Sequence, residues 1–380
     1  MQGTNRTIAR LASLLTVAAT LGALAGAVVP ASSVAAKKSA LFLQLPWNTF
    51  GQSVAISPEG VPWFGLESSE TLSLASVQEG KLTTAEVNPD HESISKENIG
   101  QTGSLAFDAE GDLWFVRGKG VDAMLVRRAP DGIETTFTPA GIRTETALTT
   151  GPDGNVWFTY DGPGAKPPGI ARMTPTGTVA QFPLDRQSSP TSIVSGPEGA
   201  LWFSDAGTGN IGRITTAGEI TLLSAGRGTY PRQVVAGPDG ALWFTENAKP
   251  VGKPGKNGKA RSEDRIGRIT TAGKVRQFRL EFGGSTDLLA ADPSGRIWFT
   301  TQKHELASIS TSGALGAHGC LGSCAAGFNA IALAPDDTLW VALGRGRTYC
   351  GGCGGGTDLI LENEGGQVGW VPPGALRPAP

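Results

Sequence analysis

Three acidic side chains in the middle of this sequence could together hold a metal ion. Asp205, Glu246 and Asp287 are spaced 41 residues apart along the chain. Carboxylate oxygens are the ligands that hard cations such as Mg²⁺ and Ca²⁺ prefer. The alternative is that the three acids form structural salt bridges.

Four cysteines near the C-terminal end could form disulfides or bind a metal. Cys320 and Cys324 are followed by Cys350 and Cys353 in a Gly-rich stretch. Four cysteines permit three connectivities, and two disulfides are the expected state in an oxidising compartment. A zinc site is the alternative, because Cys-x₃-Cys facing Cys-x₂-Cys is compatible with tetrahedral thiolate ligation. Thiol redox catalysis is the third interpretation.

A Gly- and Pro-rich segment, residues 247–264, concentrates positive charge. It contains five basic residues: Lys249, Lys253, Lys256, Lys259 and Arg261. We expect an exposed loop that could capture an anionic partner such as a cell-wall polymer or an acidic glycan. A loop that is merely solvated is the alternative.

The overall composition excludes some classes of protein. With 32 Lys and Arg against 34 Asp and Glu, the chain lacks the broad basic surface of a dedicated nucleic-acid-binding protein. Three His and four Cys argue against a protein with several metal sites.

Residues 1–36 have the pattern of a signal peptide. Arg6 and Arg10 precede an apolar run over residues 11–29, and small residues follow over 30–36. The alternative is a retained membrane anchor, because nineteen residues could just span a bilayer. We expect cleavage, and hence a secreted or extracytoplasmic protein that is not attached to a membrane.

The rest of the chain is built from seven repeats, each marked by a tryptophan. The tryptophans are spaced 41–55 residues apart: Trp63, Trp114, Trp157, Trp202, Trp243, Trp298 and Trp340. A turn such as Pro238-Asp-Gly240 precedes each tryptophan, and short apolar segments lie on both sides. Four short strands per repeat are typical of a β-propeller blade, whereas a β-solenoid fits this spacing less well.

We therefore predict an all-β, seven-bladed β-propeller with four-stranded blades over residues 37–372, followed by a tail over 373–380. The blades begin near residues 51, 102, 145, 190, 231, 286 and 328. Each indole is expected to be buried between neighbouring blades, which could not bury it alone. The segment 40–46 is expected to close the ring as the outer strand of blade seven, whose last part is residues 357–372.

The repeat resembles that of the virginiamycin B lyase family. The resemblance rests on Pro-Asp-Gly-Ala-Leu-Trp-Phe-Thr-Glu at 238–246, Ile-Gly-Arg-Ile-Thr at 266–270 and Phe-Arg-Leu at 278–280. Blades three and four match nearly as well, and the likeness covers about residues 40–372. It implies a seven-bladed propeller that opens the ester of cyclic streptogramin antibiotics by elimination, using Mg²⁺ and a histidine as proton carrier.

The residues that this activity requires are replaced. Where the resemblance implies histidines, before the first strands of the last two blades, the chain has Asp287 and Asn329. Where it implies acids around the last blade, the chain has Gly327 and Gly344. Of His91, His304 and His318, only His304 is placed to reach the same end of the ring; it could equally lie in a solvated loop.

The loops at one end of the ring, which we call the top face, are expected to hold any ligand. They join the fourth strand of one blade to the first of the next, and the second strand of each blade to its third. The long segments fall among them: 89–102, 161–168, 247–264, 316–327 and 344–356. The opposite turns are short, so variation concentrates on the top face.

Two sets of residues are predicted to surround the opening of the top face. The first follows each tryptophan by three residues: Leu66, Arg117, Tyr160, Asp205, Glu246, Thr301 and Leu343. The second begins each first strand: Gln52, Gly103, Thr146, Thr191, Arg232, Asp287 and Asn329.

We selected the candidate ligand-binding residues from these two sets, because convergent polar groups are what a ligand site requires. They are Arg117, Tyr160, Asp205, Arg232, Glu246, Asp287 and Asn329. Asp287, Asn329 and Glu246 are the candidate catalytic residues. The alternative is that these side chains cap strand ends or pair with one another, for example Arg232 with Asp205 or Glu246.

The hypothesis is an exported, monomeric, lyase-like propeller that binds a small molecule, an extracellular glycan or a cell-wall polymer at the opening of its top face. The alternative is an enzyme. It would be a divergent streptogramin-type C–O lyase, or a metal-assisted lactone hydrolase resembling those of six-bladed propellers.

The disulfide hypothesis predicts the thiol content of the secreted protein. Mass spectrometry after alkylation without reduction should find no modified cysteine among the four. Four alkylated cysteines would contradict the prediction, and retention of zinc by the same sample would favour the Cys₄ site.

Overall fold

The computed structural model describes most of the repeat region. The described residues are 41–45, 49–68, 72–86, 104–118, 123–139, 147–162, 166–246, 250–251, 261–262, 265–280, 286–301, 304–320, 326–346 and 367–371. The predicted signal peptide and the C-terminal tail lie outside them.

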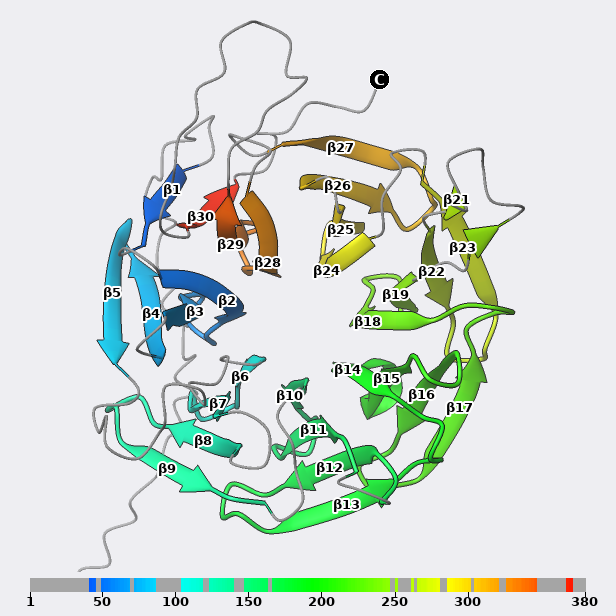
Figure 1. Ribbon diagram of the computed structural model, residues 1–380, viewed down its shortest axis with the longest axis horizontal. Coiled ribbons are helices and arrows are strands. Elements are labelled where there is room, and N and C mark those ends of the chain that lie inside the picture. Colours follow the sequence, from blue (N-terminus) through cyan, green and yellow to red (C-terminus); the bar gives the residue numbers. More distant parts are fainter. Residues whose placement is uncertain are drawn as a thin grey trace, which may run out of the picture. The chain divides into compact units, whose positions relative to one another are not determined.

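The described strands form seven four-stranded antiparallel sheets arranged in a ring, as the repeats predicted (Figure 1). Blade one contains β2 (Thr49–Ile56), β3 (Pro62–Ser68), β4 (Leu72–Gln78) and β5 (Lys81–Glu86). Blade two contains β6 (Leu105–Phe107), β7 (Leu113–Arg117), β8 (Met124–Arg128) and β9 (Glu134–Phe137). Blade three contains β10 (Leu148–Thr150), β11 (Val156–Tyr160), β12 (Gly169–Met173) and β13 (Val179–Pro183).

The other blades repeat this order. Blade four contains β14 (Pro190–Gly196), β15 (Ala200–Asp205), β16 (Asn210–Ile214) and β17 (Ile220–Ser224). Blade five contains β18 (Pro231–Ala236), β19 (Leu242–Glu246), β22 (Arg265–Ile269) and β23 (Val275–Arg279), with a small hairpin of β20 (Pro250–Val251) and β21 (Arg261–Ser262) inserted. Blade six contains β24 (Thr286–Asp292), β25 (Arg296–Thr301), β26 (Glu305–Ser310) and β27 (Leu315–Cys320).

The N-terminal strand closes the ring. Blade seven takes β28 (Ala326–Leu333), β29 (Leu339–Gly346) and β30 (Gln367–Val371) from the C-terminal end of the chain. Its outer strand is β1 (Leu41–Gln44), which pairs antiparallel with β30 from Leu41↔Trp370 to Gln44↔Gln367. Because the first and last strands share one sheet, closure joins the two ends of the repeat array. No described helix is long and apolar enough to cross a membrane.

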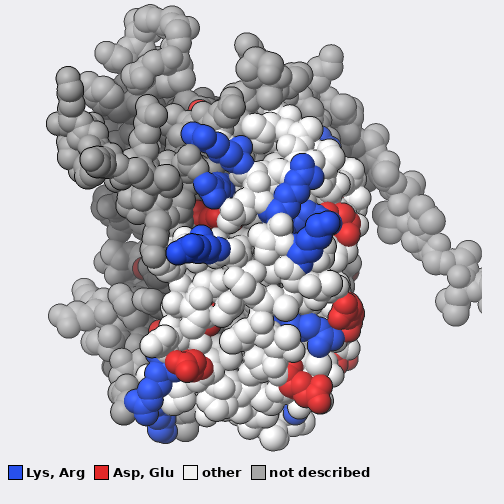
Figure 2. All heavy atoms as spheres, turned by 90° about the vertical axis from the view of Figure 1, so that its right-hand side faces the viewer, with Lys and Arg blue, Asp and Glu red and all other residues white. Residues whose placement is uncertain are grey.

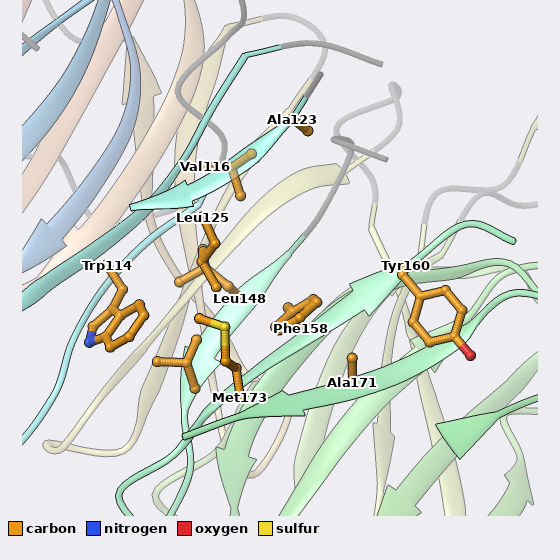
Figure 3. Close-up of a cluster of buried hydrophobic side chains, with 10 residues drawn as sticks. Trp114, Val116, Ala123, Leu125, Leu148, Phe158, Tyr160, Ala171 and Met173 are labelled. Carbon is orange, nitrogen blue, oxygen red and sulfur yellow. The ribbon is translucent and has the colours of Figure 1, made fainter. Parts of the chain in front are cut away.

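The tryptophans pack between blades, as predicted; five are buried, and Trp63 and Trp340 are half-buried. Figure 3 shows the cluster in which Trp114 of blade two meets Leu148, Phe158 and Met173 of blade three. Trp243 of blade five is fully buried in the same way against side chains of blade six. One buried aromatic side chain removes roughly 150–250 Å² from water, so these contacts hold the blades together.

In five blades the turn before the tryptophan also fixes the indole by a hydrogen bond. In blade five, Asp239 Oδ1 accepts a hydrogen bond from Trp243 Nε1 at 3.1 Å, and Asp239 Oδ2 pairs with Arg268 Nε at 2.6 Å. Burial opposes ionisation of Asp239, but the hydrogen bonds from Arg268 and Trp243 lower its pKa overall. Asp153 accepts from Trp157 Nε1 at 3.0 Å in the corresponding position of blade three. The bottom turns are therefore structural.

Arginines of the third strands connect neighbouring blades. Arg127 of blade two donates to the carbonyl of Pro175 in blade three at 3.0 Å, and Arg172 of blade three donates to that of Thr216 in blade four at 2.7 Å. The third-strand arginines of blades two and three thus serve the contact with the next blade, a role that sequence analysis did not assign.

In blades four and five the third strand carries a Gly-Arg pair, and its glycine lies beneath an aromatic ring. A Cβ added to Gly267 would lie 2.1 Å from Phe244 Cζ, and one added to Gly212 would lie 2.0 Å from Phe203 Cζ. Both phenylalanines are fully buried, so neither ring can move aside without disturbing the core.

Substitution Gly267→Ala should therefore destabilise the protein by about 1–3 kcal/mol, since overpacking forces the buried ring out of place. Chemical denaturation measures the free energy of unfolding. The double variant Gly267→Ala/Phe244→Leu is the control, and its loss should be smaller than the sum of the two single losses. Additive losses would contradict the proposed contact.

Candidate functional site

The residues that follow each tryptophan by three positions are mostly buried. Arg117 is half-buried, and all other members of this set are less than a tenth exposed: Leu66, Tyr160, Asp205, Glu246, Thr301 and Leu343. They lie at or near the ends of the second strands of the blades. Exposure to a ligand at the central opening is therefore limited for this set.

Asp205 organises the loops around it. Its Oδ1 accepts hydrogen bonds from the backbone N–H groups of Ser189 at 2.8 Å, Gly207 at 3.1 Å and Thr208 at 3.3 Å. Its Oδ2 accepts a further bond from the Thr208 hydroxyl. The carboxylate is fully buried, so these contacts support the capping role that the sequence left open.

Glu246 occupies the same position in blade five, but its carboxylate is only partly satisfied. Oε2 accepts a hydrogen bond from Gln277 Nε2 at 3.1 Å. Among the described residues Oε1 has no hydrogen-bond partner, although the side chain is almost wholly buried. Burial raises the pKa of Glu246 to about 7, against the lowering effects of the Gln277 bond and the nearby Arg265 charge.

The surroundings of Glu246 come from three parts of the chain. Gln277 on β23 also donates to Thr229 Oγ1 at 3.1 Å, and it accepts from Arg265 on β22 at 3.0 Å. Thr229 lies in the connection from blade four. Sequence analysis missed Thr229, Arg265 and Gln277, because none of them occupies a position marked by the repeat.

Arg117 and Tyr160 also contact their own blades. Arg117 pairs with Glu134 on β9 at 3.2 Å, and it donates to Thr136 at the same distance. Tyr160 lies over Gly169, where an added Cβ would be 2.6 Å from the phenolic oxygen. Burial raises the pKa of Tyr160.

The second predicted set coincides with β-bulges in the first strands. The register shifts at these positions in five blades, at Gln52, Thr191, Arg232, Asp287 and Asn329. Gly103 and Thr146 lie outside the described residues. Bulges redirect side chains and are common beside functional sites. Sequence analysis did not predict these bulges.

Two of these residues bond to the next blade near the axis. Thr191 donates to the carbonyl of Arg232 at 2.7 Å, and Asn329 Nδ2 donates to the carbonyl of Gly51 at 2.8 Å. The Arg232 side chain itself is exposed, and among the described residues no ion pair joins it to Asp205 or Glu246. The predicted pairing of Arg232 with those acids is not observed.

His304 lies at the top of the junction between blades six and seven. A Cβ added to Gly327 would be 3.3 Å from His304 Cε1, so the imidazole lies beside this glycine. A Cβ added to Gly344 would be 3.0 Å from both terminal atoms of Asn329. The two glycines are thus covered by an imidazole and a carboxamide. We call His304, Gly327, Asn329 and Gly344 the blade six–seven site.

The backbone of His304 is unusual. Its φ of 61° lies in the left-handed region, and its N–H donates to the carbonyl of Thr301 at 2.9 Å. A side chain in this region costs about 1 kcal/mol relative to glycine.

The described residues do not supply a metal site of the predicted kind. No group of three His, Cys, Asp or Glu among them is arranged to hold an ion. All the described bonds of the Asp205 carboxylate are made within its own loops, and the side chain of Asp287 lies outside the described residues. Because the side chain of Asp287 is not described, Mg²⁺ or Ca²⁺ binding by Asp205, Glu246 and Asp287 stays a prediction.

Other predicted features fall largely outside the described part of the chain. Cys324, Cys350 and Cys353 are not described, and only the backbone of Cys320 is. The same holds for most of the basic segment 247–264. Disulfide formation and the role of that segment stay predictions.

Replacement of Glu246 should change how stability depends on pH. A raised pKa in the folded state means that folding binds a proton between about pH 4.5 and pH 7. As the pH rises from about 4.5 to 7, the free energy of unfolding of the wild type should therefore fall by about 3 kcal/mol relative to that of Glu246→Gln. Denaturation at several pH values measures this. The exposed-site variant Glu219→Gln is the control and should follow the wild type; parallel curves for wild type and Glu246→Gln would refute the prediction.

Comparisons with known proteins agree with the fold. Residues 89–262 match the model of the virginiamycin B lyase family. No curated protein sequence matches the chain.

Among solved structures, a streptogramin B lyase is similar, with 22% identity, a TM-score of 0.66 and coverage of 88% of this chain and 96% of that one. A catalytically inactive virginiamycin B lyase from Staphylococcus aureus with quinupristin has 22% identity and a TM-score of 0.65, over 87% of this chain and 98% of that one.

The WD40 propeller domain of Doa1 has 12% identity and a TM-score of 0.59, over 88% of this chain and 97% of that one. Likenesses at these identities establish the fold alone. The predicted resemblance is confirmed: the chain is a virginiamycin B lyase-like seven-bladed β-propeller whose family match covers residues 89–262.

Proposed function

We propose that this chain is an extracytoplasmic lyase-like propeller that binds a small molecule at the blade six–seven site. The observation that carries the proposal is the cover of the two glycines by His304 and Asn329. An imidazole and a carboxamide both donate and accept hydrogen bonds, so the pair could orient a polar ligand. The signal-peptide pattern of residues 1–36 supports the extracytoplasmic location.

The conformation of His304 favours a functional role over a purely structural one. A residue held in the left-handed region costs stability, and such residues cluster at binding and catalytic sites. Glycine would relieve this cost. The presence of histidine at this position is therefore better explained by the contacts of its imidazole than by the turn that its backbone forms.

Binding is favoured over catalysis because of Asn329. A carboxamide does not transfer protons at neutral pH, and this one already donates to the backbone of Gly51. Asn329 can therefore position a ligand but cannot replace a proton carrier. The described donors also give no support to a metal-assisted lactone hydrolase.

A C–O lyase is the second candidate, and the position of His304 favours it. The imidazole is the one described histidine side chain at this end of the ring, and it lies where the family resemblance places functional groups of the last blade. Histidine is the most common general base of enzymes, so His304 could remove a proton from a bound ester and return it to the solvent.

The test uses quinupristin as probe, because a related lyase was solved with it. Calorimetric titration should detect binding to the wild type, and His304→Gly should weaken it by about tenfold through loss of a hydrogen-bonding group. The same variant should melt at an equal or higher temperature, since glycine relieves the left-handed backbone. Absence of quinupristin binding, or equal affinity of wild type and variant, would contradict the proposal.

Mass spectrometry of the same mixtures separates the two candidates. Elimination opens the ring without a change of mass, whereas hydrolysis adds one water. Intact quinupristin supports binding alone. A linear product of unchanged mass that disappears in His304→Gly supports the lyase, and a product with one added water would indicate a hydrolase.

A further inference from the structure

Two arginines occupy equivalent positions in successive connections of the top face. Residues 185–188 form a β-turn in the connection into blade four, and residues 226–229 form one in the connection into blade five. In each turn the N–H of the last residue donates to the carbonyl of the first, at 3.0 Å and 3.3 Å. Arg186 and Arg227 are the second residues of these turns, and they are 41 positions apart. The repeat therefore presents an arginine twice in the same local geometry.

Both turns are anchored by buried groups. Asp205 Oδ1 accepts a hydrogen bond from the backbone N–H of Ser189 at 2.8 Å, directly after the first turn. Thr229, the last residue of the second turn, is buried, and its hydroxyl accepts from Gln277 Nε2 at 3.1 Å. Because the backbone beneath each arginine is held in place, a ligand would pay less entropy for ordering these connections.

Neighbouring acids do not balance the charge of these arginines. The side chains of Arg186 and Arg227 are exposed, and no described residue forms an ion pair with either. Arg232, on the first strand of blade five, is exposed and has no ion pair with a described residue either. Asp185 is the one exposed acid of the described connections 184–189 and 225–230, and its Oδ1 accepts from the N–H of Gln187 at 2.9 Å.

The other exposed acids of blades four and five lie at the opposite end of the ring. Among the described residues they are Glu198, Glu219 and Asp239, which belong to bottom turns. Figure 2 shows the flank of the ring, in which most of the visible Asp and Glu lie toward the right edge and several Lys and Arg lie toward the left. Opposite charges are thus separated along this flank, so the top face of blades four and five attracts anions.

Uncharged polar side chains lie beside the arginines. Gln187 and Ser189 follow Arg186 in the first connection, and Thr208 lies in the loop that Asp205 holds. All three are exposed. Hydroxyl and carboxamide groups both donate and accept hydrogen bonds, which suits a ligand that carries hydroxyl groups as well as negative charge.

We propose that the top face of blades four and five binds an acidic polysaccharide across Arg186, Arg227 and Arg232. Carboxylates of the sugars would pair with the guanidinium groups, which bind carboxylates bidentately. Sugar hydroxyls would bond to Gln187 and Ser189. A chain is favoured over a single small anion because neighbouring packed sheets lie about 10 Å apart, so one carboxylate cannot pair with arginines of both connections.

This surface fits other polyanions less well. Single-stranded nucleic acids stack their bases on exposed aromatic rings. Tyr230 is the one aromatic residue of the described connections 184–189 and 225–230, and it is half-buried. An anionic membrane would need an apolar patch beside the charges. The exposed large hydrophobic residues of the described chain are only Ile133, in a bottom turn, and Leu222, within β17.

The test is titration of the whole protein with a fluorescently labelled oligogalacturonate, in which every sugar carries a carboxylate, at low ionic strength. The fully methyl-esterified oligomer keeps the chain but lacks the charge, so it should bind at least about tenfold more weakly. Galacturonic acid as monomer should also bind at least about tenfold more weakly, because it cannot engage two connections at once. Added salt should weaken binding of the oligomer, since exposed charges are screened.

The variants test the position of the surface. Arg186→Gln/Arg227→Gln should weaken oligogalacturonate binding about tenfold. Arg186→Lys/Arg227→Lys keeps the charge and should weaken it less, and Arg232→Gln should weaken it about threefold. Lys81→Gln/Lys274→Gln removes the same charge from exposed positions in bottom turns and should change binding less than about twofold. Melting curves establish that all variants are folded.

Several results would overturn the proposal. They are absence of oligogalacturonate binding, equal affinity for the methyl ester, and equal weakening in the two Gln double variants. Tighter binding of a single-stranded oligonucleotide, polyglutamate or phosphatidylglycerol vesicles, lost in Arg186→Gln/Arg227→Gln, would show that the surface recognises another class of polyanion. Quinupristin binding at the blade six–seven site uses none of these arginines, so the two proposals fail independently.

Discussion

The packing of one indole between each pair of neighbouring blades is the interaction on which the rest of the structure depends. A single four-stranded blade has two apolar faces and cannot cover either without a neighbour. Three groups of residues serve this contact. They are the tryptophans, the turn carboxylates that accept hydrogen bonds from the indoles, and the third-strand arginines that bond to the next blade. Closure by β1 supplies the neighbour that the last blade would otherwise lack.

The two ends of the ring therefore differ in role: the bottom turns are structural, and the top face carries the long connections. The bottom turns are short, and their carboxylates Asp108, Asp153 and Asp239 accept hydrogen bonds from indoles. The top face is free to vary, and there the first strands carry bulges in five blades. A bulge turns a side chain out of the regular alternation, which explains how Asn329 can reach the neighbouring blade while His304 covers Gly327.

The two acids at equivalent positions of blades four and five show how strongly local surroundings decide chemistry. Asp205 is surrounded by backbone N–H groups of its own loops, whereas Glu246 meets one amide donor and a buried environment. Their carboxylates therefore differ in hydrogen bonding although the repeat places them identically. A repeat predicts position, but the connection from the preceding blade supplies the partners.

The sequence by itself determined the fold class, the number of blades and the closing strand, because strand periodicity and turn chemistry are local and recur seven times. It also indicated which end of the ring varies, and which residues of the resembled lyase are replaced. Only the tertiary structure decided that most residues after the tryptophans are buried, that Asn329 bonds to Gly51, and that His304 lies beside Gly327. Those contacts join segments that are distant along the chain, and no local pattern encodes them.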